Sequence, residues 1–213
     1  MKEKKEIYII SGLGVDERVF TNMSFEGFSP VFIKWITPLE KETIKSYAER
    51  LASQILTPNP VIIGLSFGGM VAIEISKQMQ TDKIILIAST KTKSEIPFYY
   101  RLAGFLRIQK IVPINFFKKS NFTNWFFGVE NKVEKVLLKN ILNEMDPVFL
   151  KWAIDKIVYW DNKSIPKNLI HIHGIKDRVL PFFNVKSDIK VNGGHLITIN
   201  RADELSKILK RIL

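Results

Sequence analysis

The stretch 61–70, which reads VIIGLSFGGM, constrains the fold of this chain more than any other part of the sequence. An apolar, β-branched run stops at Gly64, and apolar residues with helical spacing follow the glycines. The pattern predicts a buried strand, a sharp turn centred on Ser66, and a helix that starts directly after the turn. We expect Gly64 and Gly68 to be required, because any side chain there would clash with a crossing chain while Ser66 takes a strained backbone conformation.

The turn itself has the form Gly-x-Ser-x-Gly, the nucleophile-elbow pattern. A strand before it and a helix after it would hold the Ser66 hydroxyl out of the turn, with the free N–H groups of the helix directed at it. The alternative is a glycine-rich strand–helix turn, such as a phosphate cradle. The rest of the chain favours the elbow, because it supplies partners for the serine.

Length and composition limit the class of protein. The 213 residues are enough for one domain (1–213) with a substantial core, and no apolar run reaches membrane-spanning length. The charged N-terminal residues lead straight into a strand without a hydrophobic secretion segment. The absence of cysteine excludes disulfides, thiol catalysis and cysteine metal sites. We expect a cytoplasmic protein without integral membrane association.

The net charge of +11 predicts a basic surface. Such a surface suits nucleic acid, an anionic membrane or an acidic partner, but it is also what a lysine-rich, solvated face produces. No nucleic-acid-binding motif is present, so no nucleic-acid partner is expected.

Strand and helix patterns alternate over most of the chain. This order calls for an α/β fold, with a parallel sheet covered by helices on both faces. The strands are expected at 6–11, 31–36, 61–63, 83–88, 168–173 and 187–191, and helices at 15–22, 43–56 and from 202 onward.

Residues 91–165 interrupt this alternation and hold more than half of the chain's aromatic side chains. Helical patterns cover 98–111, 131–143 and 147–159. We interpret the segment as an inserted helical cap over the C-terminal edge of the sheet, with Phe98, Trp125, Phe126 and Trp152 as candidate substrate contacts. The alternative is a set of ordinary sheet-covering helices with a large core, which part of the insert must form in any case.

The first part of this insert is also basic. Between 91 and 128, Glu95 is the only acidic residue. Lysine or arginine occupies positions 91, 93, 101, 107, 110, 118 and 119. A basic, aromatic lid suits an amphiphilic acidic substrate or an acidic carrier protein, and a solvated basic face explains the charges equally well.

Ser66, Asp177 and His195 each follow the C-terminal end of an expected strand. In an open parallel sheet these ends meet at one edge, where ligands bind. A serine hydroxyl becomes nucleophilic when a base takes its proton, and a carboxylate fixes the tautomer of that base. The three residues therefore predict nucleophilic catalysis by Ser66.

The choice of base and acid is narrow. The chain has three histidines, and His171 and His173 alternate with apolar residues in a strand, which favours structural roles. His195 follows two glycines in a loop and is free to reach the serine. Asp161 is the reserve acid in place of Asp177, and Asp188 is close to His195 in sequence but falls in a strand. A turn residue pairing with Arg178 or a backbone amide is the alternative for Asp177.

The chain resembles the α/β-hydrolase superfamily, and in particular its small, capped esterase-like members, including the pimeloyl-carrier-protein methyl esterases. The matching pieces occur in the same order along nearly the whole chain. They are ISGLG at 10–14, GLSFGG at 64–69, HGIKDRVLP at 173–181 and GGH at 193–195.

This resemblance implies Ser66 as nucleophile, His195 as base and Asp177 as acid, with oxyanion-hole N–H groups on Leu13 and Phe67. It implies hydrolysis through an acyl-enzyme, without metal or cofactor. Two features depart from the family. Many members have His-Gly where this chain has SG at 11–12, and the usual first two strands are missing, which leaves a minimal sheet of about six strands.

The expected function is hydrolysis of a carboxylic ester with a small-molecule acyl substrate. A thioester on coenzyme A or on an acidic acyl carrier protein is the close rival, because of the basic lid. Amidase, carbon–carbon hydrolase and perhydrolase reactions use the same three residue types. From other classes, a non-catalytic ligand binder on the same fold and peripheral membrane association through the lid remain as alternatives.

Overall fold

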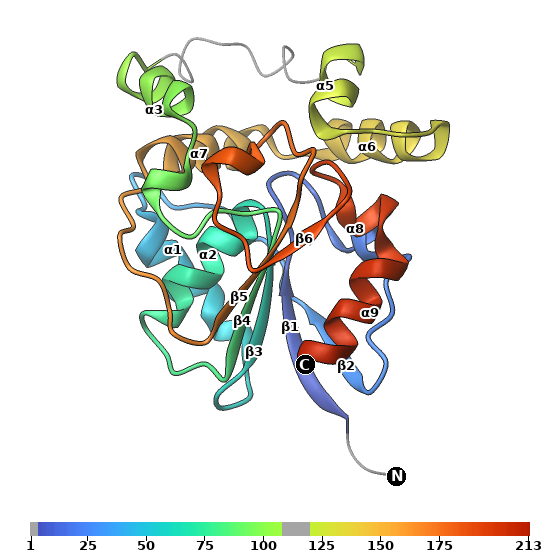
Figure 1. Cartoon of the computed structure of the whole chain (residues 1–213). Helices are drawn as coiled ribbons and strands as arrows, with labels where there is room; N and C mark the ends of the chain where they lie inside the picture. Colours follow the sequence, from blue (N-terminus) through green and yellow to red (C-terminus); the bar gives the residue numbers. More distant parts are fainter. Residues whose placement is uncertain (1–3, 108–119) are drawn as a thin grey trace.

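A six-stranded, fully parallel sheet forms the centre of the computed structural model, which describes residues 4–107 and 120–213 (Figure 1). The strand order is β2-β1-β3-β4-β5-β6. This confirms the predicted α/β class and the minimal sheet. The strands are β1 (Lys5–Ile10), β2 (Phe28–Phe32), β3 (Val61–Leu65), β4 (Lys83–Ile87), β5 (Leu169–Gly174) and β6 (Ile189–Val191).

Each central strand feeds two cores, because successive side chains point to opposite faces of the sheet. In β3, Ile62 packs with the helices of one face and Ile63 with those of the other. Both side chains are completely buried. This double burial explains why the central strands are apolar almost throughout.

The helices cover the sheet on both faces (Figure 1). One face carries α1 (Ile44–Leu51) and α2 (Phe67–Ser76), and the other carries α8 (Ile197–Asn200) and α9 (Ala202–Ile212). Thr43 starts α1 with a capping box, in which its side chain accepts from the Ser46 N–H at 3.1 Å.

Between β4 and β5, the described residues form the α-helices α3 (Phe98–Phe105), α5 (Ser120–Phe127), α6 (Lys132–Glu144) and α7 (Pro147–Tyr159). Figure 1 shows them at the end of the sheet where the strands terminate. Part of this segment belongs to the core, since Phe149 of α7 and Trp160 pack with α1 and α2. Two further aromatic residues of this segment, the phenylalanines at 116 and 117, lie outside the described residues.

The second strand lies earlier in the sequence than predicted, at Phe28–Phe32 instead of 31–36. It includes Pro30, which an edge strand tolerates because one side of its backbone needs no partner. The apolar residues beyond its end serve other contacts: Ile33 is buried, and the Trp35 ring stacks on Phe67 with centroids 5.7 Å apart. Their apolar character reflects tertiary packing and not strand position.

Several helices are shorter than the apolar spacing suggested. The expected helix at 15–22 is a single 3₁₀ turn, Glu17–Phe20, and the one at 43–56 is α1 followed by a 3₁₀ turn, Ala52–Gln54. Helix α3 ends at Phe105, and residues 108–111 of its predicted range lie outside the described part of the chain. Among the described residues, no helix is both long and apolar enough to span a bilayer.

The basic residues of the predicted lid do not form one uniform surface. Lys91 is buried and donates to the Lys186 carbonyl, and Lys93 pairs with Asp161. Two exposed arginines, at 101 and 107, remain on and just after α3, while positions 110, 118 and 119 lie outside the described residues.

Candidate active site

Ser66 occupies the sharp turn between β3 and α2. Its backbone has φ +51° and ψ −120°, a region that side-chain-bearing residues rarely adopt. Two hydrogen bonds hold it there. The Ser66 N–H donates to the carbonyl of Ile87, the last residue of β4, at 2.9 Å, and the hydroxyl of Ser89, just after β4, donates to the Ser66 carbonyl at 2.7 Å. The strained conformation predicted from the sequence is therefore present.

The glycines of the turn are required by close backbone contacts. A Cβ built on Gly64 would lie 2.5 Å from the Gly69 Cα, and one built on Gly68 would lie 2.2 Å from the Ser11 carbonyl oxygen. Gly69 is constrained as well, since its Cβ would meet the Ser89 hydroxyl at 2.4 Å. The elbow thus depends on three glycines, of which the sequence pattern indicated two.

We expect Gly68→Ala to lower the free energy of unfolding by at least about 3 kcal/mol, because the methyl group would overlap fixed backbone atoms of β1 and its loop. Urea unfolding measures this loss. The control is Gly27→Ala: Gly27 has φ +88° but nothing within 4 Å of a built Cβ, so only backbone strain of about 1–2 kcal/mol is expected. Equal losses in the two variants would contradict the steric explanation.

The loops after β5 and β6 bring Asp177 and His195 together. The Lys176 N–H donates to the Gly193 carbonyl at 2.9 Å. A Cβ on Gly174 would lie 2.4 Å from the Gly194 carbonyl oxygen, so the two loops touch backbone to backbone. The turn that follows Asp177 fixes its carboxylate, because Oδ1 accepts from the N–H groups of Val179 and Leu180.

A continuous chain of hydrogen bonds links the three predicted residues. His195 Nδ1 lies 2.7 Å from Asp177 Oδ2, and His195 Nε2 lies 3.0 Å from the Ser66 hydroxyl oxygen. Asp177 and His195 are buried, whereas Ser66 is half-buried and accessible. The arrangement allows a proton to pass from Ser66 to His195 while the carboxylate faces the opposite ring nitrogen.

The reserve acids lie elsewhere. Asp161 is exposed and pairs with Lys93. Asp188 accepts from the backbone N–H of His171 at 2.8 Å. Among the described residues, no group of three His, Asp, Glu or Cys side chains is placed to hold a metal ion.

His171 and His173 are fully buried on β5, behind Asp177. Burial lowers the pKa of His171 well below its ordinary value of 6.5, with the neighbouring His173 acting in the same direction. Burial also lowers the pKa of His173, although the negative charge of Asp177 opposes that shift. Both imidazoles are therefore neutral at pH 7.

These buried histidines predict a loss of stability on acidification. A histidine whose pKa is depressed in the folded state takes up its proton more readily in the unfolded chain, so stability is complete above pH 6.5 and falls as the pH drops below it. Each histidine contributes up to about 1.4 kcal/mol per pH unit. Urea unfolding at about pH 7.5 and 5.5 measures the effect, and an unchanged free energy of unfolding would contradict it.

The candidate oxyanion donors lie beside Ser66. A Cβ on Gly12 would be 3.3 Å from the Ser66 Cβ, so the loop that contains Leu13 lies against the elbow. Phe67 is the first residue of α2, and its N–H has no acceptor within the helix. Within the described residues, neither the Leu13 nor the Phe67 N–H donates a backbone hydrogen bond. Both are free to bind an oxygen.

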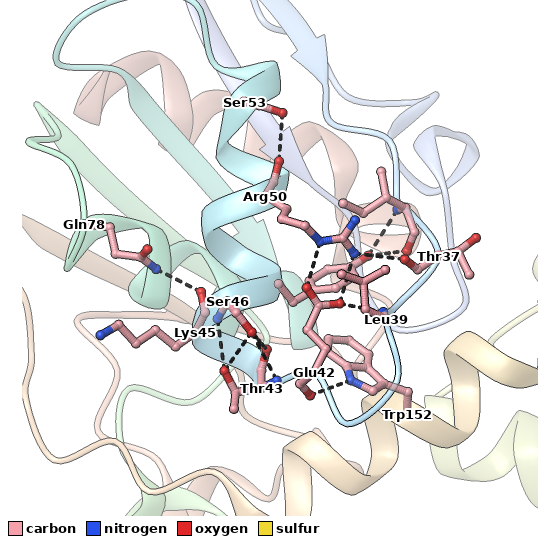
Figure 2. Close-up of polar contacts among 12 residues, drawn as sticks. Thr37, Leu39, Glu42, Thr43, Lys45, Ser46, Arg50, Ser53, Gln78 and Trp152 are labelled. Atoms are coloured by element: carbon pink, nitrogen blue, oxygen red, sulfur yellow. Dashed lines mark hydrogen bonds and ion pairs between the residues drawn. The ribbon is translucent and has the colours of Figure 1, made fainter.

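The predicted substrate contacts are only partly close to this site. Trp152 packs on Phe67 with centroids 6.0 Å apart, but its Nε1–H donates to the Glu42 carbonyl at 3.0 Å (Figure 2). Figure 2 shows Glu42 between Trp152 and Arg50, so this tryptophan joins α7 to the start of α1. In the structure it packs against the first residue of α2, next to Ser66.

The other three predicted contacts, Phe98, Trp125 and Phe126, lie on α3 and α5. Phe98 is 72% exposed, and its ring meets the ring of Tyr99 edge-on. Trp125 is 56% exposed and lies under Arg178, whose Cζ is 4.6 Å from the indole centroid. Phe126 contacts the ring of Phe127. In an irregular insert, apolar character alone does not tell which side of a short helix faces the site.

Phe127, at the end of α5, contacts the imidazole of His195. Its ring meets His195 edge-on, with centroids 5.7 Å apart and planes at 69°. The next residue, Gly128, approaches the loop of His195 so closely that a built Cβ would lie 3.2 Å from the Gly194 Cα. The cluster at 125–127 was a sequence signal for this contact, but the helix orientation selected Phe127.

A groove of about 300 Å³ lies beside the loop that follows β1, between the core and the helices α6 and α7. Trp35 and Phe149, which line it, both contact the Phe67 ring. On the core side the groove reaches Gly14, next to Leu13. The Met145 side chain lies on Gly14, where a built Cβ would be 1.9 Å from its Cε.

No protein-family model matches the chain, and no curated protein matches its sequence. Solved structures do match its fold. A lipase-esterase related protein from Clostridium acetobutylicum superposes with a TM-score of 0.72 at 13% identity, over 100% of this chain and 96% of that chain. A thermophilic esterase from Thermogutta terrifontis gives 0.68 at 16% identity, over 97% and 88% of the respective chains.

A bromoperoxidase from Bacillus anthracis is similar to the same extent, with a TM-score of 0.67 and 16% identity over 99% of this chain and 92% of that chain. At such low identities the likeness concerns the fold and not the reaction. The six parallel strands, their order and the helices on both faces agree with these structures. The chain has the α/β-hydrolase fold.

Proposed function

We propose that this protein is a serine hydrolase that cleaves carboxylic esters, with Ser66 as nucleophile, His195 as base and Asp177 as the acid that orients it. The observation that carries the proposal is the chain of hydrogen bonds at 3.0 and 2.7 Å from a half-buried serine to a buried carboxylate. The strained backbone of Ser66 supports the proposal as well. A strained conformation persists only where the surrounding contacts enforce it, and such conformations cluster at active sites.

In the proposed reaction the Ser66 oxygen attacks the ester carbonyl carbon as its proton moves to His195 Nε2. The carbonyl electrons move onto oxygen, which the N–H groups of Leu13 and Phe67 stabilise; each such donor contributes about 3 kcal/mol in comparable sites. Collapse breaks the carbon–oxygen bond to the alcohol, which leaves with the proton from His195. Water then attacks the acyl-enzyme by the same steps and restores Ser66.

The groove of about 300 Å³ is the place we assign to the acyl chain. Gly14, next to Leu13, lines one side of it, and its aromatic wall of Trp35 and Phe149 contacts the Phe67 ring, so it lies close to both proposed oxyanion donors. Arg18 lies at its rim and bridges Asp16 and Glu144 at 2.7 and 2.6 Å. This ion-pair network joins the loop after β1 to α6, and it favours an acyl chain of limited length.

Met145→Ala should extend the range of accepted acyl chains, because it removes the side chain that lies on Gly14. We expect the ratio of kcat/KM for long over short p-nitrophenyl esters to rise about tenfold. The matched control is Val148→Ala, since Val148 is 61% exposed on α7 and does not line the groove. An unchanged ratio in Met145→Ala would place the acyl chain elsewhere.

The experiment that tests the function is labelling with a small fluorophosphonate, followed by intact mass and peptide mapping. We expect one adduct, on Ser66, whose formation requires His195, and hydrolysis of at least one member of a series of simple esters. Folded protein that shows neither an adduct nor hydrolysis would overturn the proposal and favour a ligand binder on the same fold.

A thioester on an acidic acyl carrier protein is the second candidate. It is supported by the exposed arginines at 101 and 107, on and just after α3. Such an interaction weakens as salt screens the charges, whereas the turnover of a free ester does not depend on them. Turnover of a carrier-bound acyl group that is unaffected by salt would remove this candidate.

A further inference from the structure

Two histidines lie one behind the other on β5 and end at Asp177. His171 and His173 alternate along the strand, so their side chains point to the same face of the sheet, and both are 0% exposed. His173 Nδ1 is 3.3 Å from His171 Nε2, and His173 Nε2 is 2.8 Å from the Leu180 carbonyl oxygen. Leu180 belongs to the loop that carries Asp177.

These contacts fix where the protons are. A carbonyl oxygen only accepts hydrogen bonds, so His173 Nε2 carries a proton. Because the neutral ring has one proton, His173 Nδ1 is an acceptor and His171 Nε2 must be the donor to it. The two hydrogen bonds therefore run in the same order: His171 Nε2–H donates to His173, and His173 Nε2–H donates to the Leu180 carbonyl.

Asp177 receives donors on both of its oxygens. Oδ1 accepts from the Val179 and Leu180 N–H groups at 2.8 and 2.9 Å. Oδ2 faces His195 Nδ1 at 2.7 Å and lies 3.4 Å from His173 Nε2. The last distance is too long for a strong hydrogen bond, so the His173 N–H bonds to Leu180 and acts on Oδ2 through its dipole.

We infer that His173 is a positioning residue for the reaction: its Nε2–H fastens the Leu180 end of the acid loop and faces the carboxylate oxygen that holds His195. The inference rests on the proposed function. His173 touches neither the substrate space nor Ser66, and it acts through Asp177 alone. A histidine that only filled space in the core would leave the ionisation of the site unchanged when replaced by another side chain of similar size.

Other titratable groups face this pair. Asp177 and His195 face His173, and Lys91 faces His171 from the end of β4. Tyr99 and Tyr100 of α3 face Asp177, and burial raises the pKa of both phenols, so they remain neutral in the working range of a serine hydrolase.

The first test uses the wild-type protein. Nitrogen-15 NMR of the histidine rings at pH 7.5 distinguishes the two neutral tautomers, with His173→Gln to assign the signals. We expect His173 to be neutral with its proton on Nε2. A neutral ring with its proton on Nδ1, or a charged ring, would overturn the inference, whatever the enzyme hydrolyses.

The second test compares two amides at position 173. The glutamine amide nitrogen reaches the position of Nε2, whereas the asparagine amide nitrogen reaches only that of Nδ1. We expect His173→Gln to keep kcat within about threefold of wild type. We expect His173→Asn to lower kcat about 10- to 100-fold with little change in KM. In His173→Asn the pH profile of kcat/KM should also differ from that of wild type, because Oδ2 of Asp177 loses the N–H dipole that faces it.

The outcomes separate cleanly. Equal kcat and equal pH profiles in the two variants would show that His173 is only a packing residue. If His173→Asn does not fold, the tautomer of His173 and the activity of His173→Gln still test the inference. A His173→Gln variant that folds and whose kcat falls 10-fold or more would overturn it. Wild-type protein without hydrolysis and without a labelled Ser66 would overturn the proposed function instead.

Discussion

Replacing Ser66 with alanine is expected to lower kcat for every accepted ester by at least about 10⁴-fold. The alanine has no oxygen to attack the carbonyl, and the remaining rate would come from the oxyanion donors and from substrate binding alone. Stability should change little, because alanine and serine experience the same backbone strain at φ +51°. Steady-state rates with a p-nitrophenyl ester measure the loss.

A matched serine serves as the control. Ser76 lies at the other end of α2, where its hydroxyl donates to the Ile73 carbonyl at 2.7 Å, so Ser76→Ala removes a serine hydroxyl from the same helix without touching the site. It should retain wild-type rates. If Ser66→Ala also retained them while remaining folded, the nucleophile would have to be another residue.

Asp177→Asn should be almost as damaging, with a loss of about 10⁴-fold in kcat. The fold dictates how the new amide is oriented. Its oxygen must accept from the Val179 and Leu180 N–H groups, which lie 2.8 and 2.9 Å from Oδ1. The NH₂ group then faces His195 Nδ1 and forces the proton of the imidazole onto Nε2, where it can no longer take the proton of Ser66.

Asp161→Asn is the control for this substitution. Asp161 was the reserve acid, and the structure places it on the surface, paired with Lys93. Its amide should leave kcat unchanged. A large loss in Asp161→Asn together with a normal rate in Asp177→Asn would reassign the acid, and with it the interpretation of the loop after β5.

The sequence predicted the parts of the site that depend on short stretches of chain. The Gly-x-Ser-x-Gly turn between strand and helix follows from local sterics, and a Cβ built on Gly64 or Gly68 would indeed lie only 2.5 or 2.2 Å from backbone atoms. The convergence of Ser66, Asp177 and His195 followed from one further rule, that parallel strands end at a common edge. Neither step needs knowledge of how the helices pack.

The contacts of the inserted helices were less predictable. The sequence singled out Trp125 and Phe126 as substrate contacts, but not the neighbouring Phe127, whose ring contacts His195. Neighbouring residues on a helix point about 100° apart, so the rotation of α5 decides which ring faces inward. That rotation depends on contacts such as the 2.7 Å bond from Arg178 to the Trp125 carbonyl, which links residues far apart in the sequence.

By itself, the sequence predicted the α/β class with its parallel sheet, the elbow and the three residues that meet at the sheet edge, because alternating patterns and a tight turn are local properties. Only the tertiary structure decided that His173 faces both Leu180 and Asp177, since a histidine in an apolar strand reads as a core residue until its partners are placed. The same is true of the groove beside Leu13, whose walls come from distant segments that only folding brings together.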